Sequence, residues 1–406
     1  MRLFKNLLNR QGPPFRKFSR IGAVALAGGL LAACSGGPGG SGLEPLGSPS
    51  ASNAPAASGN VIGNGEVKIA LLLPLSAAGS GGTVAASLRN AADLAVQEFN
   101  GPNIQLLVKD DHGTPDGAAA AARQALSEGA ELAIGPLFAQ SVRAASGVMQ
   151  PAGKPIIAFS TDSTVAGRGT YLLSFLPETD VERIVSYAVS RGKKSFSGLI
   201  PQTAYGNVVA AAFQQSVARH GGRIVALERY SSGASLSQGA RNIAQGASQI
   251  DALFIPESGE GMPAVAQALA ANRIDTKRVQ LLGTGSWNDP RVFRLPQLAG
   301  GWFAAPDASG FDAFAQRYKA KYGSDPARIA TLSYDAVALA AALVRTRGSE
   351  RFTEATLTNP SGFAGQDGVF RFRTDGLNDR GLAVLQVGNG AASTISAAPK
   401  AFGPKS

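Results

Sequence analysis

Short, nearly continuous apolar runs recur along the chain and alternate with amphipathic stretches. The first run, Val67–Pro74, reads VKIALLLP, and a later one, Asp251–Pro256, reads DALFIP. A strand buried on both faces has this continuous pattern, as in a parallel sheet covered by helices. The stretch Thr83–Phe99 instead repeats its apolar residues every three or four positions, which predicts a helix.

The same alternation continues through the chain and predicts βαβ units. The expected strands are 67–74, 104–108, 132–134, 156–159, 197–201, 223–229, 251–256 and 279–283. The expected helices are 83–99, 116–128, 141–150, 180–190, 204–220, 237–247, 262–272, 311–322 and 330–346. Paired strands are expected at 368–373 and 383–390, and no pattern is visible from Ala391 onward. The fold class is therefore α/β, with about 330 residues available for two lobes.

The stretch Glu131–Asp162 has the organisation of a ligand site. Two apolar runs, Leu132–Ile134 and Ile156–Phe159, stop at turn-forming or hydroxyl residues, and a helix is predicted between them. The carboxyl ends of parallel strands form the crevice in which ligands bind. Hydroxyl and backbone N–H groups near helix N-termini there suit a small anion such as a carboxylate. The same residues are also typical of ordinary turns in any α/β domain.

The first 34 residues have the features of a secretory signal. Six basic residues and no acidic one precede or border an apolar run, Ile21–Leu31, that is too short to span a bilayer. The run leads into Leu31-Ala32-Ala33-Cys34, which resembles the bacterial lipoprotein box. We expect lipidation of Cys34, the only cysteine of the chain, which also excludes an intrachain disulfide. A signal anchor, or a cleaved signal with an idle thiol, is the alternative.

Two further features describe the region beyond the signal. Residues 35–65 are rich in Gly, Ser, Ala, Pro and Asn, which predicts a flexible tether between a lipid anchor and a folded body. Ser35 follows the cysteine, and by resemblance to Gram-negative sorting rules this favours the outer membrane over the inner.

Removing the signal lowers the net charge from +10 to +4, with 32 basic against 28 acidic residues. We therefore expect no nucleic-acid binding.

Residues that usually carry catalysis or bind metals are few. Asp110 and Asp111 are consecutive on an extended chain and face opposite ways, so they suit a loop or cap better than an acid/base pair. His112 and His220 are the only histidines, and no partners for a triad or a metal site are apparent. The loop after the first strand lacks the third glycine of a dinucleotide fingerprint and a phosphate-binding lysine. We expect neither catalysis nor a cofactor.

Taken in order, several stretches resemble one family. They are VKIALLLPLSAAGSGG, LVKDDHGTPDGAAAAARQAL, ELAIGPLFAQSV, PIIAFSTDSTVAGRGTYL, PQTAYGNVVAAAF, DALFIPESGEGMPAVAQAL and GFAGQDGVFRFRTDGLNDRGLAVLQVGNG. The chain resembles type I periplasmic binding proteins, and is most similar to the leucine/isoleucine/valine-binding branch of ABC importers. The resemblance runs from about Val67 to Gly390, and no single motif is specific alone.

The resemblance implies two Rossmann-like lobes joined by three crossing strands. The crossings would lie near Leu173–Pro177, Trp302–Pro306 and Phe363–Phe370. The first lobe would then comprise about 66–175 and 305–365, and the second about 176–304 and 366–395, with a tail at 396–406.

The resemblance also implies where a ligand binds. Loops matching 136–141 and 159–161 hold an α-carboxylate and α-amino group in the family, so Ser160 and Thr161 are candidate contacts, with Asp162 adjacent. Ala139 stands where amino-acid binders often have a hydroxyl, which Ser141 could replace.

In the second lobe, Tyr205 matches a ring that closes over the ligand, and Trp287 either stacks on the ligand or caps its loop. The acid that pairs with the α-ammonium in the leucine branch is replaced here by Gly285. No motif secures a substitute among Asp289, Glu257 and Asp162.

Two functions remain open at this stage. One is a lipid-anchored solute-binding protein that takes an amino-acid-like or other small carboxylate ligand and is read by an ABC permease. The other is a cell-envelope regulator similar to penicillin-binding-protein activator lipoproteins, which would contact a peptidoglycan synthase. The hydroxyls and Tyr205 favour the first, and the lipobox, the tether and Gly285 favour the second.

Overall fold

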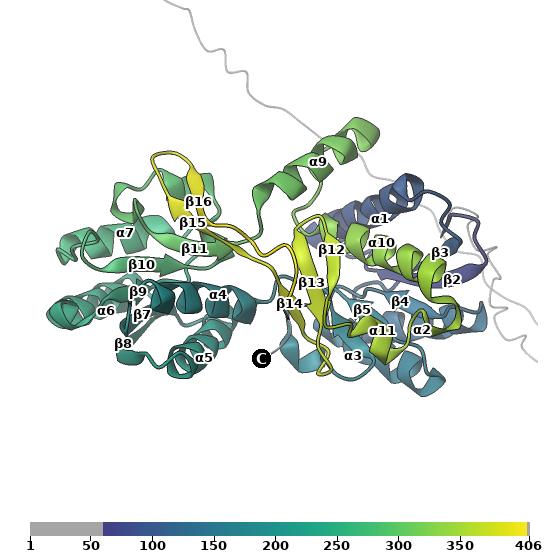
Figure 1. The fold of residues 1–406 in the computed structure, drawn as a ribbon, viewed down its shortest axis with the longest axis horizontal. Helices are drawn as coiled ribbons and strands as arrows, with labels where there is room; N and C mark the ends of the chain where they lie inside the picture. Colours follow the sequence, from purple (N-terminus) through teal and green to yellow (C-terminus); the bar gives the residue numbers. More distant parts are fainter. Residues whose placement is uncertain (1–59, 404–406) are drawn as a thin grey trace, which may run out of the picture. The chain divides into compact units, whose positions relative to one another are not determined.

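The computed structural model describes residues 60–403. The expected signal peptide, Cys34 and most of the expected tether lie outside this range. Two sheets form the framework of the described chain (Figure 1). The first has the strand order β1-β3-β2-β4-β5-β6, in which only β1 is antiparallel to its neighbour. Its strands are Val61–Ile62 (β1), Ile104–Asp110 (β3), Val67–Leu73 (β2), Leu132–Ile134 (β4), Ile156–Ala158 (β5) and Thr170–Leu172 (β6).

Alternating residues of β2 explain why its sequence is apolar throughout. Ile69 and Leu71 point into a core shared with the helices Ser80–Glu98 (α1) and Ala330–Arg347 (α10). Ala70 and Leu72 point into the opposite core, formed with Pro115–Ser127 (α2) and Ala139–Met149 (α3). Both faces of the sheet are therefore covered, as the continuous apolar pattern predicts.

The second sheet has the order β16-β15-β11-β10-β9-β7-β8. Its strands are Ala392–Ser396 (β16), Ala383–Val387 (β15), Trp302–Ala305 (β11), Gln280–Gly283 (β10), Ala252–Phe254 (β9), Ser195–Pro201 (β7) and Arg223–Tyr230 (β8). Helices Pro177–Ser190 (α4) and Ala204–Arg219 (α5) cover one face, and Gly233–Gln245 (α6) and Met262–Ala271 (α7) cover the other. The expectation of an α/β fold with two mostly parallel sheets is confirmed.

A small antiparallel sheet completes the described chain. It contains Phe363–Gly365 (β12), Gly368–Phe372 (β13) and Asn378–Arg380 (β14). Phe370 and Phe372 belong to the core that also contains α1 and α10. The remaining helices are Pro290–Phe293 (α8), Ala308–Tyr322 (α9) and Glu354–Leu357 (α11).

The chain passes three times between the two large sheets: after β6, after β11, and between β14 and β15. The third passage thus follows Arg380, whereas the sequence places it at Phe363–Phe370. Those residues instead form β12 and β13 and pack against the first core. Two other segments also differ from expectation, since Val61–Ile62 and Ala392–Ser396 form edge strands. None of the helices within residues 60–403 is long and apolar enough to cross a bilayer.

Candidate functional site

Most of the site residues expected from the central stretch line one cavity. A hollow of about 470 Å³ lies at the carboxyl ends of β4 and β5, and Ala139, Ser160, Thr161 and Asp162 all border it. Ser141 does not, because it is fully buried within α3, where its hydroxyl has no hydrogen-bond partner among the described residues. The cavity wall is otherwise mainly apolar and includes Val84, Leu137, Phe138, Phe159, Phe175 and Ile329.

Two helices begin at this cavity without a side-chain cap. Gly79 precedes α1 and Phe138 precedes α3, and at neither position does a side chain accept a hydrogen bond from the first turn of the helix. Ser80, Gly81 and Ala139 belong to these first turns and line the cavity. Helix N-termini carry unsatisfied N–H groups and a partial positive charge. The cavity therefore offers hydrogen-bond donors to an anion from two directions.

The polar loop after β5 separates into bound and free groups. The backbone N–H of Asp162 donates to the hydroxyl of Ser160, at 3.1 Å. The Asp162 carboxylate accepts bonds from the backbone and hydroxyl of Thr164, at 2.9 and 2.6 Å, and these bonds lower its pKa. Thr161 is exposed. Ser160 and Thr161 thus line the cavity, whereas the Asp162 carboxylate is bonded within its own turn.

A second cavity lies beside the first and shares Phe175 with it. Its volume is about 310 Å³. Tyr205, Gly285, Ser286, Asn288 and Asp180 border it, together with Arg328. Tyr205 thus lines this cavity.

The phenol of Tyr205 is held in a chain of hydroxyl groups. Its oxygen lies 2.7 Å from the hydroxyl of Thr284, which lies 2.9 Å from that of Ser286. Burial raises the pKa of Tyr205 to about 12, so the phenol stays protonated at neutral pH. A protonated phenol can both donate and accept a hydrogen bond.

Asp180 supplies a carboxylate at the position that lacks one in the sequence comparison. It comes from the first turn of α4, and its Oδ2 accepts a 2.9 Å bond from the backbone N–H of Gly285. A Cβ atom at position 285 would lie 3.0 Å from that same oxygen. Burial raises the pKa of Asp180 to about 7. The space beside the Gly285 backbone is thus already occupied by an acid from another element.

Trp287 is not part of either cavity wall. Its side chain is fully buried, and its Nε1 donates a 2.8 Å hydrogen bond to the carbonyl oxygen of Ile255. The indole fills the space left by the missing side chains of Gly283 and Gly301. The structure therefore places Trp287 in the core of the second sheet rather than against a ligand.

The histidines do not assemble a catalytic constellation. The hydroxyl of Ser76 and the carboxylate of Asp110 approach the same nitrogen of His112, Nδ1, at 2.6 and 3.2 Å. A triad instead needs the acid and the nucleophile on opposite ring nitrogens. His220 pairs with Glu182 at 2.7 Å. Within residues 60–403, no three His, Cys, Asp or Glu side chains gather as a metal site would require.

Sequence reasoning missed three residues of the second cavity: Phe175, Asp180 and Arg328. The guanidinium of Arg328 lies 4.8 Å from the Phe175 ring and binds Asp367 through two nitrogens, at 2.6 and 3.1 Å. Arg328 precedes α10, far from Asp180 in sequence, so only the folded chain brings them to one cavity. The sequence offers one hint of these residues. Acidic side chains occur in the first turn of α4, directly after the first passage, and this hint applies to Asp180 but not to Phe175 or Arg328.

The chain matches a known protein family over most of its length. The family model described as periplasmic binding protein matches residues 66–392. Among curated proteins, none matches the chain at a significant level.

Solved structures of similar fold cover most of the chain. A putative branched-chain amino acid ABC transporter from Rhodospirillum rubrum has 21% identity over 81% of this chain and 99% of its own, with a TM-score of 0.71. An ABC transporter substrate-binding protein from Desulfitobacterium hafniense in complex with Leu has 19% identity over 81% and 99%, with a TM-score of 0.59. A solute-binding protein from R. palustris in complex with benzoate has 19% identity over 84% and 98%, with a TM-score of 0.56. The resemblance drawn from the sequence is confirmed.

Proposed function

Because this chain belongs to the periplasmic binding protein family, we propose that it is the solute-binding component of an ABC importer and takes a small carboxylate ligand. The observation that carries the proposal is the cavity at β4 and β5, where two uncapped helix N-termini and two hydroxyl side chains meet. Members of this family are solute-binding proteins, and family membership implies a periplasmic location.

The carboxylate is placed against Ser160, Thr161 and the N-terminus of α3. Ligand carboxylates accept hydrogen bonds readily from hydroxyl and backbone N–H groups, and these charge-assisted bonds are roughly twice as strong as neutral ones. The mainly apolar wall of the same cavity suits a hydrocarbon or aromatic side chain. The second cavity then receives the other end of the ligand, with Phe175 common to both.

Asp180 favours an amino-acid-like ligand. Its carboxylate accepts one hydrogen bond from Gly285 N–H, and it forms no ion pair among the described residues. A carboxylate has room for about four such bonds, so an ammonium group would complete it. Tyr205, which lines the same cavity as Asp180, would contact the ligand's ammonium group from the other side. Ligands of the benzoate type, as in the R. palustris protein, lack that amine and would leave Asp180 unused.

We further propose that the chain is lipid-anchored through Cys34 and stands off the membrane on the segment from Ser35 to the start of β1 at Val61. The division into two lobes belongs to the same proposal, with the last boundary moved from about 365 to Arg380, because β12 and β13 pack against the first core. Ser35 after the cysteine favours the outer membrane. Closure of the lobes on a ligand would be the state that a permease reads.

The lipobox and the low-complexity segment after it also suit a second candidate function. A cell-envelope lipoprotein that regulates a peptidoglycan synthase needs such reach, and it needs no ligand. It would use the same fold as a protein-docking module, as the resemblance to penicillin-binding-protein activators suggests. The two functions differ in whether the cavities bind a solute.

A binding panel separates the two candidates. We expect at least one proteinogenic amino acid to raise the melting temperature of the purified protein and to give a saturable isotherm by calorimetry. Ser160→Ala and Thr161→Ala should each weaken that binding at least about tenfold, since a hydrogen bond to a charged group contributes about 1.5–3 kcal/mol. Ser190→Ala, which removes an exposed hydroxyl at the far end of α4, is the control and should bind normally.

A flat response across amino acids and small aromatic acids would refute the importer function. Capture of a peptidoglycan synthase from envelope extracts by the same protein would then support the second candidate.

A further inference from the structure

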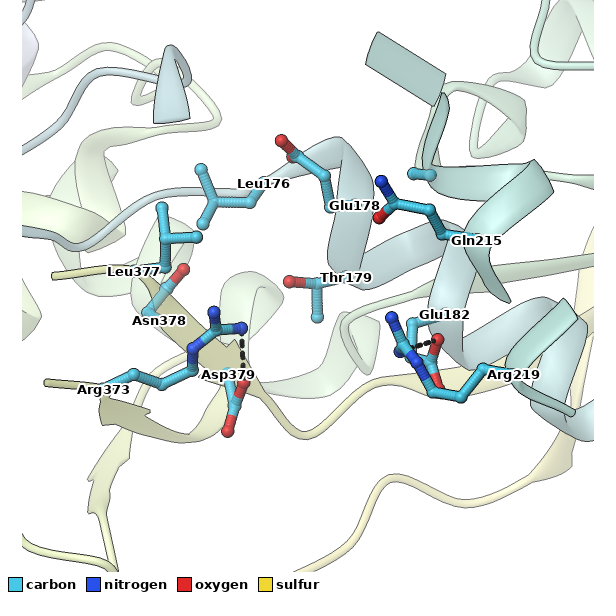
Figure 2. Close-up of a pocket in the computed structure, with 11 residues that line it drawn as sticks. Leu176, Glu178, Thr179, Glu182, Gln215, Arg219, Arg373, Leu377, Asn378 and Asp379 are labelled. Atoms are coloured by element: carbon cyan, nitrogen blue, oxygen red, sulfur yellow. Dashed lines mark hydrogen bonds and ion pairs between the residues drawn. The ribbon is translucent and has the colours of Figure 1, made fainter. Parts of the chain in front are cut away.

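A third cavity lies outside the two that form the proposed ligand site. Its volume is about 400 Å³, and it shares no lining residue with either of them. Three regions enclose it: the start of α4, the second half of α5, and the β13–β14 turn together with the first residues of β14 (Figure 2). Its apolar part is formed by Leu176, Ala212 and Leu377. The polar part consists mainly of hydrogen-bond acceptors.

Asn378 is the clearest of these acceptors. Its side chain is 2% exposed, and its Nδ2 donates a 2.9 Å hydrogen bond to the carbonyl oxygen of Ser174. That bond fixes the orientation of the amide, because a carbonyl can only accept. The Oδ1 atom therefore faces the other way and has no partner among the described residues. In Figure 2 the side chains of Asn378 and Thr179 face the same space.

Glu178 is the second acceptor without a donor. Its Oε2 atom is buried and has no hydrogen-bond partner within the described chain. Glu178 also forms no ion pair there, although it lines the cavity. A buried acceptor left without a donor destabilises the fold, and more so if it is charged. Glu178 and Asn378 thus both line the cavity, and each has one buried oxygen without a donor among the described residues.

The cations of the cavity do not supply that donor, because each is held by another acid. Arg219 binds Glu182 at 2.7 Å, and Glu182 also bonds Ser216 and His220. Arg373 binds Asp375 and lies 3.8 Å from Asp379. Figure 2 shows these two arginines on opposite sides of the open space. The lining charges sum to minus one, from three acids and two arginines.

We propose that this cavity binds a small organic cation, a primary ammonium or guanidinium compound, through Glu178, Asn378 and Thr179. An ammonium group has three N–H donors and no acceptor, which complements a carboxylate, an amide oxygen and a hydroxyl. A short methylene chain would lie along Leu176, Ala212 and Leu377. An anion would instead meet an unpaired carboxylate, and a neutral alcohol would leave the charge of Glu178 uncompensated.

The position of the cavity links it to the passages between the sheets. Ser174 lies on the first passage, and its carbonyl oxygen accepts bonds from both Asn378 and Arg380, which precede the third. A ligand that bonds Asn378 would therefore contact a residue that joins the first and third passages through the carbonyl oxygen of Ser174.

Calorimetry on the full chain tests the proposal with defined probes: putrescine and agmatine as cations, and 1,4-butanediol as the neutral control. Saturable binding of a cation, without binding of the diol, is expected. Glu178→Gln should weaken it at least about tenfold. Glu260→Gln, which removes an exposed acid elsewhere on the chain, should leave it unchanged.

A pair of substitutions at one exposed position guards against effects of misfolding. Gln215 lies on the outer rim of the cavity on α5. Gln215→Glu should tighten binding of putrescine, and Gln215→Lys should weaken it, with both proteins keeping the wild-type melting temperature. Absence of cation binding, equal binding of the diol, or indifference to all three cavity substitutions would overturn the proposal.

Discussion

Asp180 and Gly285 determine each other's role at the scale of single residues. The carboxylate of Asp180 occupies the space that a side chain at position 285 would need, and the Gly285 N–H holds it there. The resemblance to the leucine-binding branch, taken position by position, implies only that an acid is missing at position 285. The folded chain shows an acid in the adjoining space, contributed by α4. Ligand selectivity at such a site follows the position of the charge, whichever residue carries it.

The first prediction concerns the charge of Asp180. Asp180→Asn keeps an acceptor for Gly285 N–H but removes the negative charge, so an amino acid should lose its advantage over the deaminated acid with the same side chain. Matched pairs, such as leucine and 4-methylpentanoate, measured by calorimetry on both proteins, give this advantage as a ratio of dissociation constants. We expect a fall of about tenfold in that ratio.

Asp289→Asn is the matched control for this measurement. Asp289 lies in the loop that contains Gly285, but its carboxylate is already bonded to Arg291. An unchanged ratio in Asp180→Asn would remove Asp180 from ligand recognition and leave solute binding itself intact. Stronger binding of the deaminated acid by the wild-type protein would do the same.

At the scale of elements, the sequence predicted what depends on local pattern and missed what depends on distant partners. Strands such as β2 and β9 are continuous apolar runs, because helices cover both of their faces, and this pattern is visible without a structure. The edge strands β1 and β16 are short or polar and exist only by pairing with β3 and β15. The third passage was misplaced for a similar reason. The sequence around Phe370 and Phe372 has an ordinary strand pattern. Only the packing of these two side chains shows that they belong to the first core.

The same contrast applies to the candidate site. Ser160 and Thr161 directly follow a predicted strand, and Tyr205 lies in the first turn of the helix that follows another. Parallel sheets place ligands at such positions, and the three residues line cavities. Trp287 is also at a strand end, but the glycines at 283 and 301 open a space beneath it that its indole fills. A single sequence does not reveal whether an aromatic ring points inward or outward from its loop.

The second prediction tests the N-terminal cap of α5, the helix that carries Tyr205. Thr203 caps α5, and its hydroxyl accepts a 2.9 Å hydrogen bond from Gly206 N–H. Thr203→Ala should lower the free energy of unfolding by about 1 kcal/mol, the usual loss for an N-cap. Thr203→Ser retains the hydroxyl and should stay within a few tenths of the wild-type value. Urea unfolding followed by circular dichroism measures both, and equal losses in the two variants would contradict the capping role.

At the scale of the whole molecule, buried charges gather where the chain passes between the sheets. The Arg380 side chain is 6% exposed, lies over the ring of Phe175 at 4.6 Å, and donates through Nε to Ser174. Its other two nitrogens have no hydrogen-bond partner within the described residues. Burial lowers the pKa of Arg380, and Asp367 and Asp335 oppose this effect. The passages are therefore joined by charges that are near one another but incompletely bonded, an arrangement that a change of protonation can alter.

The third prediction follows from Asp335, whose Oδ1 accepts a 2.8 Å bond from Gln366 N–H while its Oδ2 is unpartnered among the described residues. Burial raises the pKa of Asp335 to about 7, well above its value of about 4 in an unfolded chain. The folded state thus binds this proton more tightly, and the stability it contributes is complete below pH 4 and is lost as pH rises towards 7. Asp335→Asn cannot ionise, so it should gain stability relative to the wild type between pH 5 and pH 8. Urea unfolding at both pH values measures this difference.

Asp289→Asn is the control. Its difference in stability from the wild type should be the same at pH 5 and pH 8, because Arg291 lowers the pKa of Asp289 and the carboxylate stays charged across this range. If the difference between Asp335→Asn and the wild type were constant from pH 5 to pH 8, Asp335 would not titrate with folding, and the buried charges at the passages would be insensitive to protonation.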